Sequence, residues 1–491
     1  MLVANRGEIA LRIIRTARAS GLRTVAVYSE ADAAMPHAAA ADEARPIGPA
    51  EALHSYLNGP AIIEAALASG ADAIHPGYGF LSESAQFAAA VTKAGLTFVG
   101  PPPEVLSAAG DKVGARRLAQ RVGVPVVPGT ETADLATARS FAALNGYPIM
   151  IKAAAGGGGR GIRVVSDESE LGAALDAAAR EAQAAFKDGR LFLEKYLPAP
   201  RHVEVQVLGD ARGRVITLGE RECSMQRRHQ KIIEESPSPA LTPALRARMV
   251  EAAAALASAV GYRNAGTVEF LVDGEGFYFL EINARLQVEH PITELRFDCD
   301  LVAMQLGLAA GESLSELPPP RGHAIECRIY AEDASKDFRP AAGPVLHLQL
   351  PGGPGIRVDT FLTPGIEIGT HYDGLLAKLI AWGSDREQAR RRALGALDEF
   401  MLTGVLHTAS FLRAVVASEP FARGQFSTRF VSEFLPQWRP AEESIKAAAL
   451  LAARVAHGRP VSASAADRGA ADRRPRSPWE ALGAFRLGNR S

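Results

Sequence analysis

The sequence predicts an α/β protein built from consecutive domains, and three patterns indicate this. Residues 1–105 alternate strands with helices, which is typical of a doubly wound parallel sheet. From 148 to 290 strands dominate, which indicates an α+β domain with hairpins. Residues 322–434 mix short strands with a helix and form a third, mixed α+β block. At ~150 residues per domain, 491 residues are enough for three domains.

In the first domain, apolar runs mark the strands and apolar residues at helical spacing mark the helices. Residues 7–20, for example, place Ile9, Ile13 and Ala17 on one side of a helix. We expect strands within 2–5, 24–29, 73–80 and 97–100, and helices over 7–20, 60–68 and 83–93. The chain starts almost inside its first strand, so the natural N-terminus is expected a few residues upstream.

The second domain is expected over 106–310, with a subdomain at about 130–200. Helices are predicted over 110–123, 168–186 and 242–260, and strands over 148–152, 162–165, 191–197, 202–209, 215–220, 267–272 and 277–283. The third domain, 322–434, has expected strands at 324–331 and 378–383 and a helix at 385–400. Residues 435–491 predict an Ala-rich helix, a disordered linker at 457–478 and the truncated start of a further domain.

The composition excludes several classes of protein. A formal net charge of −1 argues against a nucleic-acid-binding protein. No apolar run reaches ~18 residues and no signal-peptide pattern opens the chain, so neither a membrane span nor secretion is expected. The cysteines, Cys223, Cys299 and Cys327, are widely spaced and form no CxxC motif. They predict a cytoplasmic protein without disulfides or a zinc site, and a buried thiol at Cys223 rather than a nucleophile.

A glycine loop over 156–161 lies between two predicted strands. Glycine runs of P-loops and dinucleotide-binding motifs open a helix, whereas this one joins strand to strand, like the loops that cover nucleotide phosphates in kinases. Backbone without Cβ atoms approaches phosphate oxygens closely, and Lys152 before the loop supplies a cation. The loop therefore predicts a phosphate-binding flap; the alternative is a flexible surface hairpin.

Two predicted strands and a basic segment carry further polar residues. The predicted strand 191–197 is apolar at first and polar toward its end. There Glu194 can accept a hydrogen bond from an adenine amine or a ribose hydroxyl, and an ordinary strand end accounts for these polar residues equally well. Residues 202–207 alternate three valines with His202, Glu204 and Gln206. That pattern fits a binding face or an ordinary solvated face. Residues 227–231 include three basic residues and a histidine. This favours a basic surface that binds phosphates or an anionic substrate over a solvated loop.

The most informative segment is EINARLQVEH, residues 281–290. Every second residue is polar, so an extended chain presents on one face Glu281, Asn283, Arg285, Gln287 and Glu289. A hairpin signal at 273–276 can place Glu269 beside Glu281. Two carboxylates and an amide oxygen suit Mg²⁺ that bridges nucleotide phosphates, and the alternative is a solvated sheet face. The planar guanidinium of Arg285 can bind a carboxylate or phosphate through two hydrogen bonds, and Glu289 is free to act as a base.

Together these motifs resemble biotin carboxylase, an ATP-grasp enzyme, as found in the α subunits of acyl-CoA carboxylases. The resemblance covers residues 2–434 in unbroken order. It is carried by ANRGEIALRI (4–13), HPGYGFLSE (75–83), GDK (110–112), GGGGRG (156–161), EKYL (194–197), PRHVEVQV (200–207), ERECSMQRRHQK (220–231), EINARLQVEHPITE (281–294) and GHAIECRIYAED (322–333). It implies a Rossmann-like N-terminal domain, a central ATP-grasp domain with a glycine flap, and the family's C-terminal domain.

The resemblance also implies roles for residues at matching positions. Contact with ATP is implied for Lys112, Lys152, Gly157, Gly158, Gly159, Glu194, Lys195, Leu197, His202, Gln226 and His229. Two Mg²⁺ or Mn²⁺ ions would be held by Glu269, Glu281 and Asn283. Bicarbonate would be bound by Lys231, Arg285, Gln287 and Val288, and deprotonated by Glu289. Arg328 would stabilise the biotin enolate, with Tyr78 and Gly79 lining the biotin site; a structural salt bridge is the alternative for Arg328.

The implied reaction has two halves. Bicarbonate attacks the γ-phosphate of ATP to give carboxyphosphate and ADP, and carboxyphosphate then decomposes to CO₂ and phosphate. The phosphate takes the proton from biotin N1, and the resulting enolate attacks CO₂. No methionine is followed by lysine, as the family's biotin acceptor motif requires, so the biotin is expected on a separate carrier. A carboxyltransferase partner and a homodimer or larger assembly are also implied.

Two departures from the family pattern leave alternatives open. The chain begins closer to its first strand than the family does, and residues 295–300, LRFDCD, replace a small turn that contains Thr and Gly. One alternative is another bicarbonate-activating ATP-grasp ligase, such as a carbamoyl-phosphate-type enzyme. The other is an inactive assembly subunit. Biotin dependence separates the first from a biotin carboxylase, and nucleotide binding without turnover would indicate the second.

Overall fold

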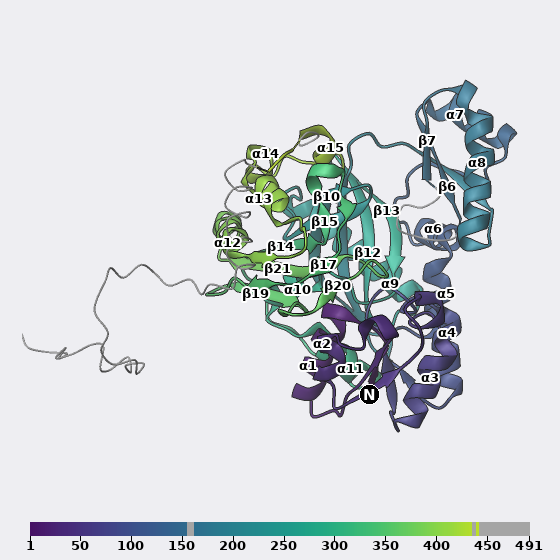
Figure 1. Ribbon diagram of the computed structural model, residues 1–491. Helices are drawn as coiled ribbons and strands as arrows, with labels where there is room; N and C mark the ends of the chain where they lie inside the picture. The colour runs from purple at the N-terminus through teal and green to yellow at the C-terminus, as the bar shows by residue number, and fades with distance from the viewer. Residues whose placement is uncertain (155–161, 435–437, 441–491) are drawn as a thin grey trace, which may run out of the picture. The chain divides into compact units, whose positions relative to one another are not determined.

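The computed structural model describes residues 1–154, 162–434 and 438–440, and Figure 1 labels many of their helices and strands. The predicted glycine loop, including Gly157, Gly158 and Gly159, lies outside the described residues. So do the linker and the apolar segment predicted near the C-terminal end. Among the described residues, no helix combines the length and apolar character that crossing a bilayer requires.

The N-terminal part forms the predicted parallel sheet, with strand order β3-β2-β1-β4-β5. Its strands are β1 (Leu2–Val3), β2 (Val25–Tyr28), β3 (Glu43–Pro46), β4 (Ala73–His75) and β5 (Thr97–Phe98). Its helices are α1 (Gly7–Ala19), α2 (Pro36–Ala40), α3 (Gly59–Ala68) and α4 (Ala85–Lys93). The sequence pattern did not predict β3, because this edge strand, EARP, is polar and carries a proline.

The central sheet has eight strands in the order β13-β12-β9-β10-β11-β14-β21-β19, all paired antiparallel. They are β9 (Arg201–Gly209), β10 (Val215–Arg227), β11 (Gln230–Ser236), β12 (Asn264–Asp273), β13 (Gly276–Asn283), β14 (His323–Tyr330), β19 (Ile356–Thr360) and β21 (Leu375–Gly383). The helices α9 (Pro243–Ala259), α10 (His290–Phe297), α11 (Leu301–Ala309) and α12 (Arg386–Glu399) accompany them. One sheet therefore joins strands from the second and third sequence blocks.

The valines of β9 show why this sheet can carry a buried polar face. Val203, Val205 and Val207 pack with apolar residues of α9, including Met249 and Leu256. Because side chains alternate along a strand, the polar residues of β9 are then on the opposite face. That face is the one that builds the site described below.

A smaller antiparallel sheet, β7-β6-β8, comprises β6 (Ile149–Ala153), β7 (Ile162–Val165) and β8 (Leu191–Lys195). The helices α7 (Leu135–Asn145) and α8 (Glu168–Phe186) pack against it (Figure 1). The helix predicted over 168–186 is α8, and the one predicted over 110–123 is α6 (Lys112–Arg121). The sequence pattern missed α7 and also α5 (Pro103–Gly110), whose first residues belong to a proline run.

Shorter elements complete the described chain. They are β15 (Glu332–Asp333), β16 (Arg339–Pro340), β17 (Gly343–Pro344), β18 (His347–Gln349), β20 (Glu367–Ile368), β22 (Met401–Thr403), α13 (Ala409–Ala417), α14 (Glu419–Ala422) and α15 (Phe430–Phe434), with 3₁₀ turns at Glu30–Asp32, Ala52–His54 and Ala334–Lys336.

One local prediction was wrong. The segment 281–289 is not extended throughout, because β13 ends at Asn283 and Glu289 is already the N-cap of α10, whose first turn contains a proline. The basic segment at 227–231, for which a solvated loop was the alternative, belongs to a hairpin of β10 and β11 that pairs Arg227 with Gln230. Its two turn residues, Arg228 and His229, have φ angles of 50° and 66°, as a tight hairpin turn requires.

Candidate active site

A cavity of about 1110 Å³ collects the polar residues that the sequence singled out. Its walls come from the N-terminal part, the small sheet, the polar face of the central sheet, and Thr428, Arg429 and Ser432 at and just before α15. The predicted site residues that line it are Tyr78, Gly79, Lys112, Lys152, Glu194, Lys195, Leu197, His202, Gln226, His229, Lys231, Glu269, Glu281, Asn283, Arg285, Gln287, Val288 and Arg328. Glu289 is fully buried and lies behind this wall.

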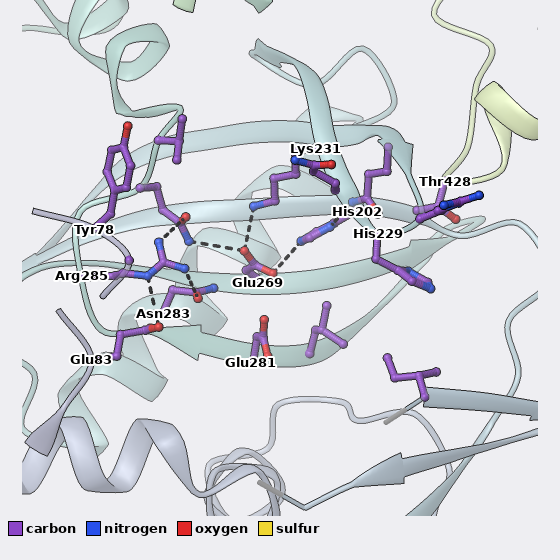
Figure 2. Close-up of a pocket in the computed structure, with 18 of the residues that line it drawn as sticks. Tyr78, Glu83, His202, His229, Lys231, Glu269, Glu281, Asn283, Arg285 and Thr428 are labelled. Atoms are coloured by element: carbon purple, nitrogen blue, oxygen red, sulfur yellow. Dashed lines mark hydrogen bonds and ion pairs between the residues drawn. The ribbon is translucent and has the colours of Figure 1, made fainter. Parts of the chain in front are cut away.

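Glu269 and Glu281 face each other across two neighbouring strands, as the hairpin signal predicted. They are direct partners in the register of β12 and β13, and Asn283 lies two residues further along β13 on the same face (Figure 2). Lys112 from α6 reaches Glu281 at 3.4 Å. Two carboxylates and an amide oxygen are hard oxygen donors, so this set fits Mg²⁺ or Mn²⁺.

Lys231 is the electrostatic centre of the polar face. Its ammonium lies 2.6 Å from Glu204, 2.8 Å from Glu269 and 2.7 Å from Glu289. Burial lowers the pKa of Lys231, but the surrounding acidic groups outweigh burial and hold that pKa well above its usual value. One lysine on β11 thus links carboxylates from β9, β12 and the start of α10.

The polar residues of β9 are buried rather than solvated, so the solvated-face alternative is wrong for this strand. His202, Glu204 and Gln206 are at most 7% exposed. His202 Nε2 lies 2.8 Å from Glu269, and Gln226 lies 2.6 Å from the other ring nitrogen. Burial lowers the pKa of His202, but Glu269 outweighs burial and raises that pKa above its usual value.

Glu289 is held between two cations. One carboxylate oxygen accepts from Lys231 at 2.7 Å and the other from Arg328 at 2.8 Å. Burial raises the pKa of Glu289, but Lys231 and Arg328 outweigh burial and hold that pKa well below its usual value. Arg328 also contacts Glu234, a buried carboxylate that the sequence pattern did not single out. The predicted salt-bridge alternative for Arg328 therefore coexists with its position in the cavity wall.

At another part of the cavity, Glu194 is already paired. Its carboxylate contacts Lys152 at 2.5 Å and Arg116 at 2.8 Å. The side chain that was expected to accept from a nucleotide is thus committed to two cations. Arg116 was missed because it lies on α6, 78 residues before its partner, with no local motif.

Arg285 extends from the segment after β13 across the cavity wall (Figure 2). It donates to Asn283 at 3.0 Å and Gln287 at 2.8 Å, and it pairs with Glu83 at 3.2 Å. Glu83 was not predicted as a site residue, although it ends the motif HPGYGFLSE. Since Glu83 belongs to the N-terminal part, this ion pair fixes the arginine against a second wall of the cavity.

Comparison with known proteins identifies the relatives of this chain. Three family models match in order: "Biotin carboxylase, N-terminal domain" over 1–106, "Carbamoyl-phosphate synthase L chain, ATP binding domain" over 111–317 and "Biotin carboxylase C-terminal domain" over 326–433. The biotin carboxylase of Pseudomonas aeruginosa is 48% identical over 441 residues, which cover 89% of this chain and 98% of that protein. The chain belongs to the biotin carboxylase family.

Two further relatives support this assignment. The mitochondrial methylcrotonoyl-CoA carboxylase subunit alpha of Dictyostelium discoideum is 45% identical over 501 residues, covering 99% of this chain and 70% of that protein. The biotin carboxylase domain dimer of the Hydrogenobacter thermophilus 2-oxoglutarate carboxylase, solved with MgADP, ADP and bicarbonate, superposes with a TM-score of 0.86 at 44% identity, covering 90% of this chain and 98% of the other. Family and fold class are thus as the motifs predicted, and the chain is an ATP-dependent carboxylase.

Proposed function

We propose that this chain carboxylates biotin with bicarbonate and ATP, through carboxyphosphate, as the first half-reaction of an acyl-CoA carboxylase. The observation that carries the proposal is the single cavity in which Lys231, Arg328 and the Glu269–Glu281 pair meet. An anion-activating site needs fixed cations beside a base, and this arrangement supplies both. The relative solved with MgADP and bicarbonate supports the same substrates here.

The nucleotide would bind along the cavity wall that contains Lys112, Lys152 and His229. The strand end at 194–197 would lie beside its adenine ring. Glu269, Glu281 and Asn283 would hold the Mg²⁺ or Mn²⁺ ions, which when bound offset the negative charge of the phosphates. Lys112 now pairs with Glu281, so it is placed where phosphate and metal charges would meet. The glycines 157–159 would cover the phosphates.

Bicarbonate would bind between Lys231 and Arg285, with Gln287 and Val288 beside it. Glu289 would take its proton. In the ligand-free arrangement both oxygens of Glu289 are engaged by cations, so its basicity is low. An anion that draws Lys231 away from Glu289 raises the basicity of this carboxylate at the moment the proton must move.

Biotin would bind near Tyr78 and Gly79, and Arg328 would stabilise the enolate that forms when N1 loses its proton to phosphate. The biotin would arrive on a carrier protein, and the product would pass to a carboxyltransferase. We further propose a cytoplasmic enzyme that forms a homodimer or a larger assembly, as a dimer is described for the relative above. Its proposed domains are 1–105, 106–310 and 322–434, followed by 435–491.

The test is ADP release by the purified chain with Mg²⁺, bicarbonate and free biotin, each omitted in turn. We expect release that needs bicarbonate and rises with biotin. Glu289→Gln should lower it at least ~100-fold, because general bases contribute ~10²–10⁴-fold. The matched control is Glu387→Gln, a surface carboxylate that pairs with the neighbouring Arg390 and Arg391.

Two outcomes would contradict the proposal. Bicarbonate-dependent release that ignores biotin would indicate another bicarbonate-activating ligase. ATP binding without any turnover would indicate an inactive assembly subunit. Equal loss in both glutamine variants would show that the assay does not report on Glu289.

A further inference from the structure

Lys378 is a fully buried lysine to which no role has been assigned above. It lies within β21, and its side chain is 0% exposed. Burying an ammonium group is costly unless several partners satisfy it. It is also the register partner of Arg328 on β14, so two cations lie directly opposite each other on one sheet face. Like charges in that position destabilise a sheet, which suggests a purpose other than stability.

The partners of Lys378 come from three separate parts of the chain. Its ammonium donates to the backbone carbonyl of Val288 at 3.1 Å. It lies 3.3 Å from the carboxylate of Glu8 on α1 and 3.7 Å from that of Asp359 on β19. Val288 belongs to the irregular segment between β13 and α10, where no ladder hydrogen bonds fix the backbone. Lys378 supplies a charged hydrogen bond to the Val288 carbonyl, beside the bonds that His290 makes to the neighbouring Gln287 carbonyl.

Glu8 connects Lys378 to the other side of the cavity. Glu8 lines the cavity itself, and the hydroxyl of Tyr78 donates to its second carboxylate oxygen. The ammonium of Lys378 also lies 5.9 Å from the centre of the Tyr78 ring. Val288, Lys378, Glu8 and Tyr78 thus form one continuous chain of polar contacts, in which the buried Lys378 joins three residues of the cavity wall.

We infer that Lys378 is a positioning residue that couples two substrate subsites, by holding the Val288 carbonyl on one side and, through Glu8, the Tyr78 hydroxyl on the other. This inference rests on the proposed function, in which Val288 lies at the bicarbonate subsite and Tyr78 at the biotin subsite. Lys378 touches neither substrate and lies outside the nucleotide wall, so its removal should affect two substrates and spare the third.

Lys378→Met tests this, because methionine keeps much of the volume and removes the charge. Initial rates of ADP release are measured while ATP, bicarbonate and biotin are varied separately. We expect the KM values for bicarbonate and biotin each to rise at least ~10-fold, as loss of a charged hydrogen bond predicts, with the KM for ATP within ~2-fold. The control is Arg386→Met, which removes a cation of α12 that pairs with Glu235 on β11 and should leave all three KM values unchanged.

A double-mutant cycle with Tyr78→Phe distinguishes energetic coupling between Lys378 and Tyr78 from a general loss of packing around the cavity. If Glu8 transmits the effect, the KM for biotin in Tyr78→Phe/Lys378→Met should equal that of Lys378→Met alone within ~2-fold. Additive losses, or a rise in all three KM values, would overturn the inference. If Lys378→Met does not fold, Glu8→Gln cuts only the link to Tyr78. It should raise the KM for biotin and leave the KM for bicarbonate within ~2-fold, because Lys378 still donates to the Val288 carbonyl.

The outcomes also distinguish this inference from the proposed function. A wild-type chain without biotin-stimulated turnover contradicts the proposed function. A wild-type chain that turns over, with a Lys378→Met variant of unchanged KM values, contradicts the role of Lys378 alone. Bicarbonate binding by calorimetry gives an activity-independent readout: the affinity should fall ~10-fold in Lys378→Met and stay unchanged in Arg386→Met.

Discussion

Among single residues, Glu326 is expected to respond most clearly to pH. It lies opposite Glu234 in the register of β14 and β11, and neither of its oxygens has a hydrogen-bond partner among the described residues. Burial raises the pKa of Glu326 well above its usual value. The folded chain therefore holds this proton more tightly than the unfolded chain, so stability falls as the pH rises above the ordinary carboxylate pKa.

We expect Glu326→Gln to raise the free energy of unfolding at pH 8 by about 1–3 kcal/mol, which is the cost of an unsatisfied buried group, and by less at pH 5. Urea unfolding at the two pH values measures this. Glu316→Gln, at an exposed position, is the control. Equal behaviour of the two variants at both pH values would rule out a buried, protonated Glu326.

Among the elements, the connection from α10 to α11 contains the segment 295–300 that departs from the family pattern. Helix α10 ends at Phe297, Asp298 adopts a left-handed conformation with φ 49°, and Asp300 caps α11 by accepting from the Ala303 N–H at 2.9 Å. Asp300 also accepts from Arg12 at 2.8 Å and Thr16 at 2.6 Å, both on α1. This segment therefore forms a helix cap that is also tied to the N-terminal part.

Asp300→Ala should lower the free energy of unfolding by about 2 kcal/mol, the sum of a lost cap and lost side-chain bonds. Thr242→Ala removes the cap of α9 alone and should cost about 1 kcal/mol. Burial raises the pKa of Asp300, but Arg12 outweighs burial and holds this pKa below its usual value. The stability that ionised Asp300 contributes is therefore lost as the pH falls below ~4, and the difference in unfolding free energy between the wild-type chain and Asp300→Ala should shrink there. Denaturant titrations of both variants measure their free energies of unfolding. An equal loss of stability in the two variants would contradict the stabilising contact between Asp300 and α1.

Elements with strong local patterns were predictable, and the others had weak or conflicting ones. Helix α8 matches its predicted range because apolar residues recur along it at helical spacing. The edge strand β3 and the helix α5 start from polar or proline-rich stretches, which carry little signal. The alternation in 281–289 predicted one extended face, but β13 ends at Asn283 and helix α10 begins at His290, so the later residues of the pattern are not extended.

For the molecule as a whole, residue types and local pairs were predictable, and partners far apart in the sequence were not. The Glu269–Glu281 pair follows from a hairpin, which is a local signal. The ion pairs of Glu194 with Arg116 and of Glu289 with Arg328 join residues 78 and 39 positions apart, and no periodicity specifies such contacts. Biotin itself entered only through the resemblance to a family, because no local pattern identifies that substrate.

The cavity walls draw on residues from Asn5 to Ser432, so ligand binding should stabilise the described chain as one unit. At 100 times its Kd, MgATP should raise the free energy of unfolding by about 2.7 kcal/mol, and ATP with a metal chelator should raise it less. The metal-dependent part should disappear in Glu281→Gln, because that carboxylate faces Glu269 across the strand pair. Thermal unfolding with each ligand measures the shifts. Equal stabilisation with and without Mg²⁺ in the wild-type chain would contradict the metal assignment of Glu269, Glu281 and Asn283 while leaving the nucleotide wall intact.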